Sequence, residues 1–176
     1  STTGAPVLFL LALDKAAGAA WTSSGANPNY YKITLPLATT ATASGLANFS
    51  VALGTTGEAK QLYMGDLHGN LWKLDFDLAS AGTADWTMNK LSPFVKSGVA
   101  YPLYIAKDAT ALTKRQPITM APSLIRGNSA SSTYVAFGTG KYLEVADKSS
   151  TSQQSVYAIF DNESTTSDDA SNSARE

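Results

Sequence analysis

Residues 62–77, LYMGDLHGNLWKLDFD, constrain the fold of this chain more than any other stretch. Strand-forming runs flank His68-Gly69-Asn70, and Gly and Asn tolerate the positive φ that a two-residue hairpin turn requires. Because strand side chains alternate with a period of two, apolar and charged residues of the outgoing strand separate onto opposite faces. The apolar face holds Trp72, Leu74 and Phe76, and Lys73 and Asp75 point to the other side. The stretch therefore predicts a β-hairpin.

The composition indicates a globular chain with little charge. Its 176 residues are 44% hydrophobic and 10% aromatic, which is enough for one domain with a core. Only 15% are charged and the formal net charge is −1, which argues against nucleic-acid binding. The absence of cysteine excludes disulfides, thiolate metal ligands and a cysteine nucleophile.

Neither a membrane span nor a signal peptide is expected in these residues. The longest apolar run, Ala5–Leu13, is far shorter than the ~20 residues that cross a bilayer, and it lacks a basic leader. The first residue is Ser1 rather than Met, so we expect a piece of a longer protein.

Short runs of β-forming residues between Gly, Pro and Asn predict about ten strands and no helix. The expected strands are residues 7–13, 30–35, 48–53, 62–64, 71–76, 86–91, 102–106, 116–125, 134–137, 141–145 and 155–160. The continuous apolar run at 7–13 favours a strand buried on both faces. Residues 162–176 are rich in Ser, Asn and Asp and are expected to form a flexible tail.

Three segments share a pattern of apolar strand, Gly-containing turn and aromatic strand with a nearby acid: residues 7–21, 62–75 and 133–147. The clearest two recur after about seventy residues, which is typical of a four-stranded propeller blade with its loops. We therefore predict an all-β chain in which residues 1–161 form antiparallel β-propeller-like blades. The chain has material for about two and a half blades, fewer than a closed ring needs, so a partial propeller is expected.

Four motifs, in this order, resemble those of the PilY1 family of type IV pilus biogenesis and tip-adhesion proteins. They are Gly65–Asp75, Ile118–Pro122, Phe137–Leu143 and Gln154–Asp161. The resemblance covers roughly residues 7–161 and is to the C-terminal propeller of that family. It implies a non-catalytic, exported protein that supports pilus assembly or opposes retraction and attaches to surfaces.

The resemblance also implies partners and a location. Expected partners are minor pilins or a pilus-tip complex, together with a host or abiotic surface ligand. The expected location runs from the periplasm to the cell surface and pilus tip.

Two features of some relatives are absent from this sequence. The calcium loop needs acids at one-three-five spacing, which none of the nearest acids has: Asp66, Asp75, Asp77, Asp161, Asp168 and Asp169. An Arg-Gly-Asp integrin motif is also missing, because Arg126-Gly127-Asn128 lacks the carboxylate. Calcium control and integrin binding are therefore not carried over, and no cofactor or metal site is expected.

Candidate site residues have structural interpretations beside functional ones. Asp66 could bind a metal, but a carboxylate accepting backbone N–H groups in the turn is favoured. His68 is the only histidine, so a zinc site or a triad is disfavoured and a solvent-facing turn is expected. Gly138-Thr139-Gly140-Lys141 lacks the spacing of a phosphate loop and is read as a bend between strands.

Four aromatic residues, Tyr63, Trp72, Tyr142 and Tyr157, could form a sugar- or quinone-binding stripe. Packing between blades is favoured, since aromatics bury large areas. Two alternative functions remain open. One is a quinoprotein-like enzyme, because ALDKAAGAAW at 12–21 resembles a blade signature of quinone-dependent dehydrogenases. The other is a non-catalytic scaffold propeller of the cell envelope.

Overall fold

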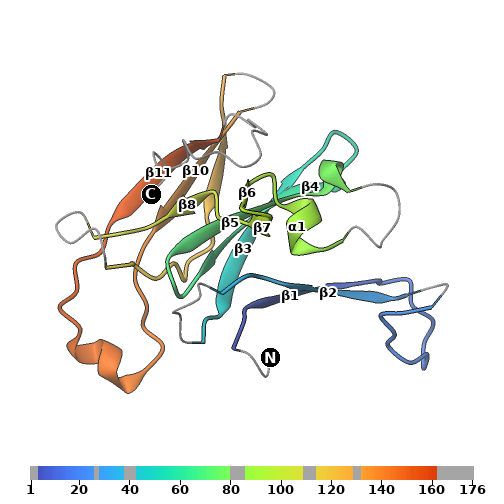
Figure 1. Cartoon of the computed structure of the whole chain (residues 1–176). Coiled ribbons are helices and arrows are strands. Elements are labelled where there is room, and N and C mark those ends of the chain that lie inside the picture. The colour runs from blue at the N-terminus through green and yellow to red at the C-terminus, as the bar shows by residue number, and fades with distance from the viewer. Residues whose placement is uncertain are drawn as a thin grey trace.

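The computed structural model describes residues 4–25, 28–37, 43–79, 86–108, 114–128 and 132–161. Strands dominate these residues (Figure 1). The strands are β1 (Val7–Leu11), β2 (Tyr30–Thr34), β3 (Leu46–Leu53), β4 (Ala59–Asp66), β5 (Asn70–Asp75), β6 (Val95–Lys96), β7 (Val99–Ala100), β8 (Tyr104–Ile105), β9 (Ser123–Arg126), β10 (Thr133–Gly138) and β11 (Val156–Asp161). The helices are η1 (Phe76–Leu78), α1 (Met88–Leu91) and η3 (Val145–Ser149). The predicted tail at 162–176 lies outside the described residues.

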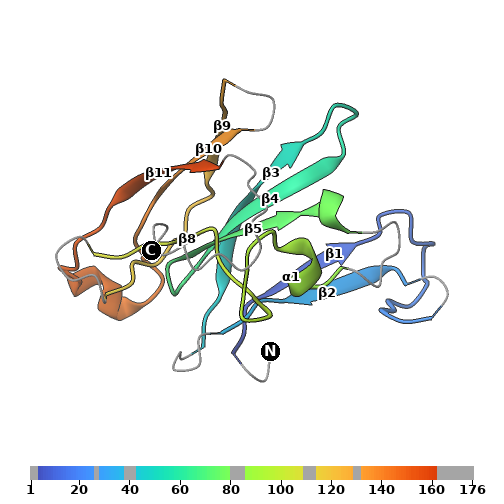
Figure 2. The same cartoon turned by 45° about the horizontal axis from the view of Figure 1, so that its top comes forward.

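Three antiparallel sheets lie side by side, with the four-stranded sheet β3-β4-β5-β8 between the other two (Figures 1 and 2). One neighbour is the pair β1-β2, and the other is β11-β10-β9. A small hairpin, β6-β7, lies on the connection between β5 and β8. The all-β prediction is confirmed, and the four-stranded sheet has the chain-order topology of one blade.

The central sheet buries both faces, and the alternation of side chains along β4 and β5 explains how. Leu62, Met64, Trp72 and Leu74 join a core on the side of β1-β2. Tyr63 and Leu71 join a second core, which includes Val135 and Phe137 of β10. Fully burying a large apolar side chain contributes about 1.5–3 kcal/mol, so a sheet with two apolar faces is stable only with cover on both.

The charged residues of β5 also point away from the Trp72 face, as predicted, but they are buried. The Lys73 ammonium lies 2.7 Å from the Asp161 carboxylate of β11, and the two side chains are 1% and 0% exposed. The Tyr63 hydroxyl donates to the same Asp161 oxygen at 2.8 Å. This group, Lys73, Asp161 and Tyr63, joins the central sheet to the β11-β10-β9 sheet through polar bonds within an apolar core.

The turn of the central hairpin is closed by the Asp66 carboxylate. Asp66 Oδ1 accepts the backbone N–H groups of His68 and Asn70 at 2.8 and 3.0 Å. Asp66 Oδ2 accepts the Asn70 side-chain amide at 2.7 Å and the Trp72 indole N–H at 2.9 Å. The predicted role of Asp66 as a turn carboxylate is therefore observed, and the bond to Trp72 extends that role into the core.

The turn differs in one detail from the two-residue turn that was predicted. Gly65 pairs with Leu71, and the Gly69 N–H donates to the Asp66 carbonyl at 3.1 Å, so the loop is longer. Gly69 has the positive φ of 76°, whereas Asn70 is the first residue of β5. A Cβ on Gly69 would lie 2.6 Å from the Gln116 carbonyl oxygen, so close packing also requires glycine there.

Residues 86–91 were predicted as a strand, and this prediction is wrong. Met88–Leu91 form one α-helical turn, in which the Leu91 N–H donates to the Thr87 carbonyl at 2.9 Å. Met88 and Leu91, three residues apart, both pack into the core beside Trp72. Apolar residues in so short a run fit a strand or a helical turn, and tertiary packing decides between them.

Residues 141–145 were also predicted as a strand and do not form one. Asp147 Oδ2 accepts the N–H groups of Leu143 and Glu144 at 2.8 and 2.9 Å, taking the place of a strand partner. The helix η3 begins at Val145. Tyr142, Leu143 and Val145 are 71%, 63% and 82% exposed, so no core draws this segment into a sheet.

Three further strands are shorter than expected or less buried. The run at 7–13 forms β1, but Phe9 and Leu11 are each 53% exposed, because β1-β2 is at one end of the stack and only its inner face is covered. Residues 102–106 provide only Tyr104–Ile105 of β8, and 116–125 provide only the start of β9. Pro102, Pro117 and Pro122 lack the N–H that a ladder needs.

We predict that Lys73→Met destabilises the protein by about 3–5 kcal/mol, because Asp161 is left charged and buried without its cation. Lys73→Met combined with Asp161→Asn should cost less than the sum of the two single changes by about 1 kcal/mol or more. Chemical denaturation of the four proteins measures this coupling.

The exposed pair Lys60–Asp77, at 3.2 Å, offers a matched control. Its equivalent cycle, Lys60→Met with Asp77→Asn, should give a coupling of about 0–1 kcal/mol. Equal coupling in the two cycles would contradict the structural role given to Lys73.

We predict that Asp66→Asn destabilises the protein by about 2–4 kcal/mol, because an amide group would face N–H donors that the carboxylate accepts. The indole N–H resonance of Trp72 should shift, since its acceptor is altered. Denaturation and NMR of the tryptophan side chains measure both effects. Asp14→Asn, at an exposed position, should change neither, and an unaltered Trp72 resonance in Asp66→Asn would refute the assigned bond.

Candidate functional site

The four aromatic residues singled out in the sequence do not form one stripe. Tyr63 and Trp72 belong to different cores on opposite faces of the central sheet. Tyr157 packs beside the Tyr63 core, with its ring 5.3 Å from that of Phe137. Tyr142 is 71% exposed in the loop before η3. Packing between sheets explains three of the four, and the predicted packing role is wrong for Tyr142.

Asp66 and His68 are parts of the turn rather than a reactive pair. Both Asp66 oxygens accept hydrogen bonds from the hairpin, so the carboxylate is committed to structure. His68 is half-buried, and its backbone carbonyl lies 3.4 Å from Arg115 Nη1. Among the described residues no three His, Asp or Glu side chains are grouped so as to hold a metal ion.

The Gly138–Lys141 segment is a bend, as predicted. The Thr139 N–H donates to the Ser155 carbonyl at 2.9 Å, and Gly140 has a φ of 128°. Lys141 does not face an open phosphate cradle, because its ammonium lies 3.1 Å from Asp147 and 3.3 Å from Glu144. These residues fix the shape of the loop that follows β10.

The ion pairs of this loop shift two pKa values in opposite directions. Hydrogen bonds to Asp147 and then Glu144 raise the pKa of Lys141. The N–H donors of Leu143 and Glu144 lower the pKa of Asp147 below its ordinary value. A lowered carboxyl pKa means that the loop is stabilised at neutral pH and loses this stabilisation as the pH falls through that pKa.

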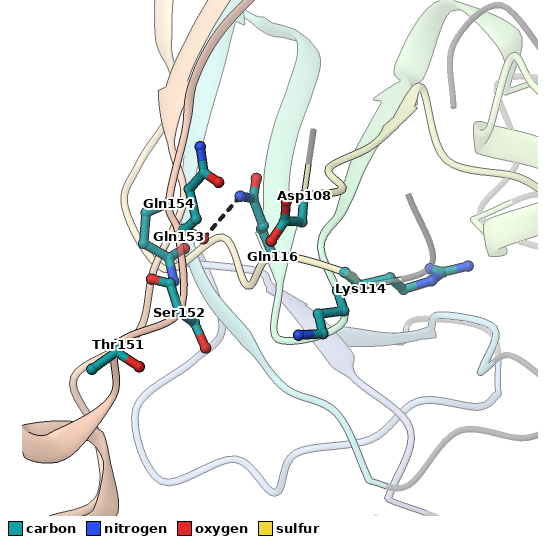
Figure 3. Close-up of a pocket in the computed structure, with 8 residues that line it drawn as sticks. Asp108, Lys114, Gln116, Thr151, Ser152, Gln153 and Gln154 are labelled. Atoms are coloured by element: carbon teal, nitrogen blue, oxygen red, sulfur yellow. Dashed lines mark hydrogen bonds between the residues drawn. The ribbon is translucent and has the colours of Figure 1, made fainter. Parts of the chain in front are cut away.

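A polar hollow of about 530 Å³ is the more promising feature of the described residues. One wall comes from the connection between β8 and β9, and the other from the segment just before β11 (Figure 3). The lining residues are Asp108, Lys114, Arg115, Gln116, Thr151, Ser152, Gln153 and Gln154. Amides, hydroxyls and charged groups therefore dominate the lining.

Gln116 forms a fixed floor between the two walls. It is only 2% exposed, and its side-chain amide donates to the Gln153 carbonyl at 3.0 Å and lies 3.1 Å from the Ser155 hydroxyl (Figure 3). The Tyr157 hydroxyl lies 3.0 Å from Gln116 Oε1 and 2.7 Å from the Lys107 carbonyl. The segment 154–161, singled out as a motif, thus holds the floor in place.

Arg115 is held by the other motif, the central hairpin. Its Nη1 donates to Asn70 Oδ1 at 2.7 Å, and Asn70 is itself bonded to Asp66. The adjacent Gln116 backbone N–H donates to the Ala106 carbonyl at 3.0 Å. Two motifs that are distant in sequence therefore fix the neighbouring residues Arg115 and Gln116 at the edge of one hollow.

A second hollow, of about 470 Å³, lies between the start of β3 and the loop after β10. Leu46, Leu67, Tyr142 and Leu143 give it a more apolar lining than the first. The Asn48 amide donates to the Thr119 carbonyl beside it at 2.8 Å, which links β3 to the strand region before β9.

Sequence reasoning missed the buried role of Lys73 and the pair Arg115-Gln116. The position of Lys73 between Trp72 and Leu74 was an available signal, because a charged residue within an apolar hairpin needs a partner if both faces are buried. Gln116 had no such signal, since its burial depends on Tyr157 and Ser155. No helix of the described residues could span a membrane, being too short or too polar.

The quinone-dehydrogenase signature at 12–21 lies in the loop between β1 and β2. Its Trp21 is 51% exposed, with the Lys15 ammonium 4.8 Å from the ring centroid. Trp21 therefore lies beside a cation and is not packed in an interface between blades.

Comparison with known proteins places these motifs in one family. The family described as the PilY1 beta-propeller domain matches residues 38–175. The type IV pilus biogenesis factor PilY1 of Pseudomonas aeruginosa (strain PAO1) is 39% identical over 113 residues, covering 60% of this chain and 10% of the relative. A PilY1 homolog of Xylella fastidiosa is 33% identical over 128 residues, covering 67% of this chain and 8% of the relative.

A solved structure agrees with these relatives. The crystal structure of the Pseudomonas aeruginosa PilY1 C-terminal domain superposes with a TM-score of 0.59 and 30% identity, covering 77% of this chain and 29% of that one. The chain spans about a tenth of the length of the curated relatives it matches. With the blade-like central sheet and the family match over most of its length, the chain belongs to the PilY1 beta-propeller domain family.

Proposed function

We propose that this chain is a non-catalytic propeller segment of a type IV pilus biogenesis protein. In this role it supports pilus assembly or controls retraction, and it contributes to attachment to surfaces. The observation that carries the proposal is the family match over residues 38–175. The stacked antiparallel sheets of the structure agree with it. The relatives are named as type IV pilus biogenesis factors.

The ionisable residues of the motifs are engaged in bonds within the protein, which supports a binding and scaffolding role over catalysis. Asp66 accepts four hydrogen bonds within its hairpin, and Lys73 is paired with Asp161 inside the core. A general acid or base must reach the proton that it moves. These side chains are buried and already paired, so they are poorly placed to contact a substrate. No observation favours a quinoprotein-like enzyme or an envelope scaffold propeller over the pilus role.

The proposed setting follows from the same family membership. The protein acts between the periplasm, the cell surface and the pilus tip, with minor pilins or a tip complex as partners. A host or abiotic surface is the proposed target of attachment, and the exposed polar hollow is the candidate contact region within the described residues.

Deletion of the coding region for this chain in its host tests the proposal. We expect fewer surface pili in sheared fractions and a smaller twitching zone, both restored by complementation with the intact gene. The same deletion in a strain lacking the retraction ATPase separates the two roles, because pili return there if the protein opposes retraction and stay absent if it is needed for assembly. Normal pili and normal twitching after deletion would refute the proposed function.

A further inference from the structure

We propose that the polar hollow between the β8–β9 connection and the 151–154 segment binds a saccharide. This inference rests on the proposed function, because it assigns a ligand class to surface attachment. The hollow of about 530 Å³ falls in the range of about 300–1,000 Å³ that small-molecule sites occupy. It is large enough for a mono- or disaccharide.

The chemistry of the lining matches hydroxyl groups. Gln153, Gln154 and Gln116 carry amides that both donate and accept, and Thr151 and Ser152 carry hydroxyls that do the same. A sugar hydroxyl is also both donor and acceptor, so each of these side chains can either donate a hydrogen bond to it or accept one from it. The hollow lacks the hydrophobic and aromatic lining that most ligand pockets use to hold apolar molecules.

Part of the lining is free to make new bonds. Within the described residues, the Lys114 ammonium, the Gln153 amide and the Thr151 hydroxyl have no hydrogen-bonded partner. They lie on both walls, with Lys114 across from Thr151 and Gln153 (Figure 3). A ligand between the walls could therefore bond to both without breaking a contact that the protein makes.

The charge of the hollow favours a polar ligand without a large net charge. Arg115 directs its Nη1 to Asn70 at 2.7 Å, so this guanidinium is anchored to the hairpin. Because Asn70 is neutral, Arg115 keeps its charge, so the lining carries two cations, Lys114 and Arg115, and one carboxylate, Asp108. A phosphate or sulfate site would concentrate donors and cations, and a cation site would concentrate carboxylates. In this lining neutral amides and hydroxyls outnumber the charged groups, and Asp108 opposes an anion beside Lys114 and Arg115, so neither pattern is matched.

The floor is fixed before a ligand arrives. Gln116 is 2% exposed and its amide is bonded to Gln153 and Ser155, while Tyr157 bonds its oxygen. Burial, followed by the neighbouring Tyr157, raises the pKa of Tyr104, which packs 5.1 Å from the Tyr157 ring. Tyr104 thus stays neutral behind the floor at physiological pH. A rigid floor lowers the ordering cost that weak saccharide binding must overcome.

Titration of the intact protein with methyl α-D-mannopyranoside, methyl β-D-galactopyranoside, N-acetylglucosamine and lactose tests the site. Saturation-transfer-difference NMR reports binding of each sugar and gives a Kd from its concentration dependence. Two variants remove lining groups that are exposed at the surface: Lys114→Met and Gln153→Ala. Lys32→Met, at an exposed position on β2, removes the same charge from a different sheet and is the matched control.

We expect saturable binding of at least one sugar, weakened about threefold to tenfold in Lys114→Met and Gln153→Ala and unchanged in Lys32→Met. Thermal melting of each variant should match that of the wild type, so a weaker signal reports the site. Absence of saturable binding to all four sugars overturns the inference. Binding that is unaffected by both lining variants, or weakened equally by Lys32→Met, also overturns it.

Pilus counts and twitching in strains carrying the same variants separate this inference from the proposed function. Lys114→Met and Gln153→Ala should leave both at the wild-type level, because neither residue joins the sheets. If sugars fail to bind while deletion still abolishes pili, the saccharide site is refuted and the pilus role stands. If sugars bind at the site while deletion leaves pili intact, the pilus role is refuted and the saccharide site stands.

Discussion

The buried ion pair between Lys73 and Asp161 is the interaction on which the arrangement of the sheets depends. Its charged atoms lie 2.7 Å apart within an almost inaccessible core. Transferring each charge out of water costs several kcal/mol, so the pair is tolerated only where its partners are correctly placed. The Tyr63 hydroxyl adds a bond to the same Asp161 oxygen. A shift of β11 relative to β5 would separate the Lys73 ammonium from the Asp161 carboxylate, so the pair favours one relative placement of the two sheets.

The residues that mark the family are largely those that fix neighbouring segments to one another. Asp66 ties the hairpin turn to Trp72 in one core, and Asp161 reaches Lys73 across the other. Gly69 allows the turn to approach the Gln116 backbone closely. Each of these residues therefore meets a steric or electrostatic demand of stacking one sheet on the next.

The hairpin and its alternation could be predicted from sequence because turn chemistry and period-two patterning are local properties. The position of Lys73 between Trp72 and Leu74 signalled that it needs a partner if buried, but the partner could not be predicted, since Asp161 is in a strand far along the chain. The helix at Met88–Leu91 was missed because a short run of alternating residues is compatible with either structure. The loop at 141–145 was missed because its apolar residues are typical of a strand. In the fold, the Asp147 side chain accepts the backbone N–H groups that a neighbouring strand would otherwise bond. The polar hollow was missed because its two walls come together only in the fold.

The same stacking that buries the central sheet leaves the outer faces of its neighbours open. Phe9 and Leu11 on β1, and Tyr134 and Phe160 on the β11-β10-β9 sheet, are 43–53% exposed. In a closed propeller such faces pack against further blades, so these side chains have the composition of an interface. The polar hollow lies at a different place, where the β8–β9 connection meets the residues before β11. Its floor residue Gln116 is bonded to Tyr157 of β11, the strand that also carries Asp161. The shape of the hollow is therefore coupled to the placement of β11, the strand that the ion pair with Lys73 joins to the central sheet.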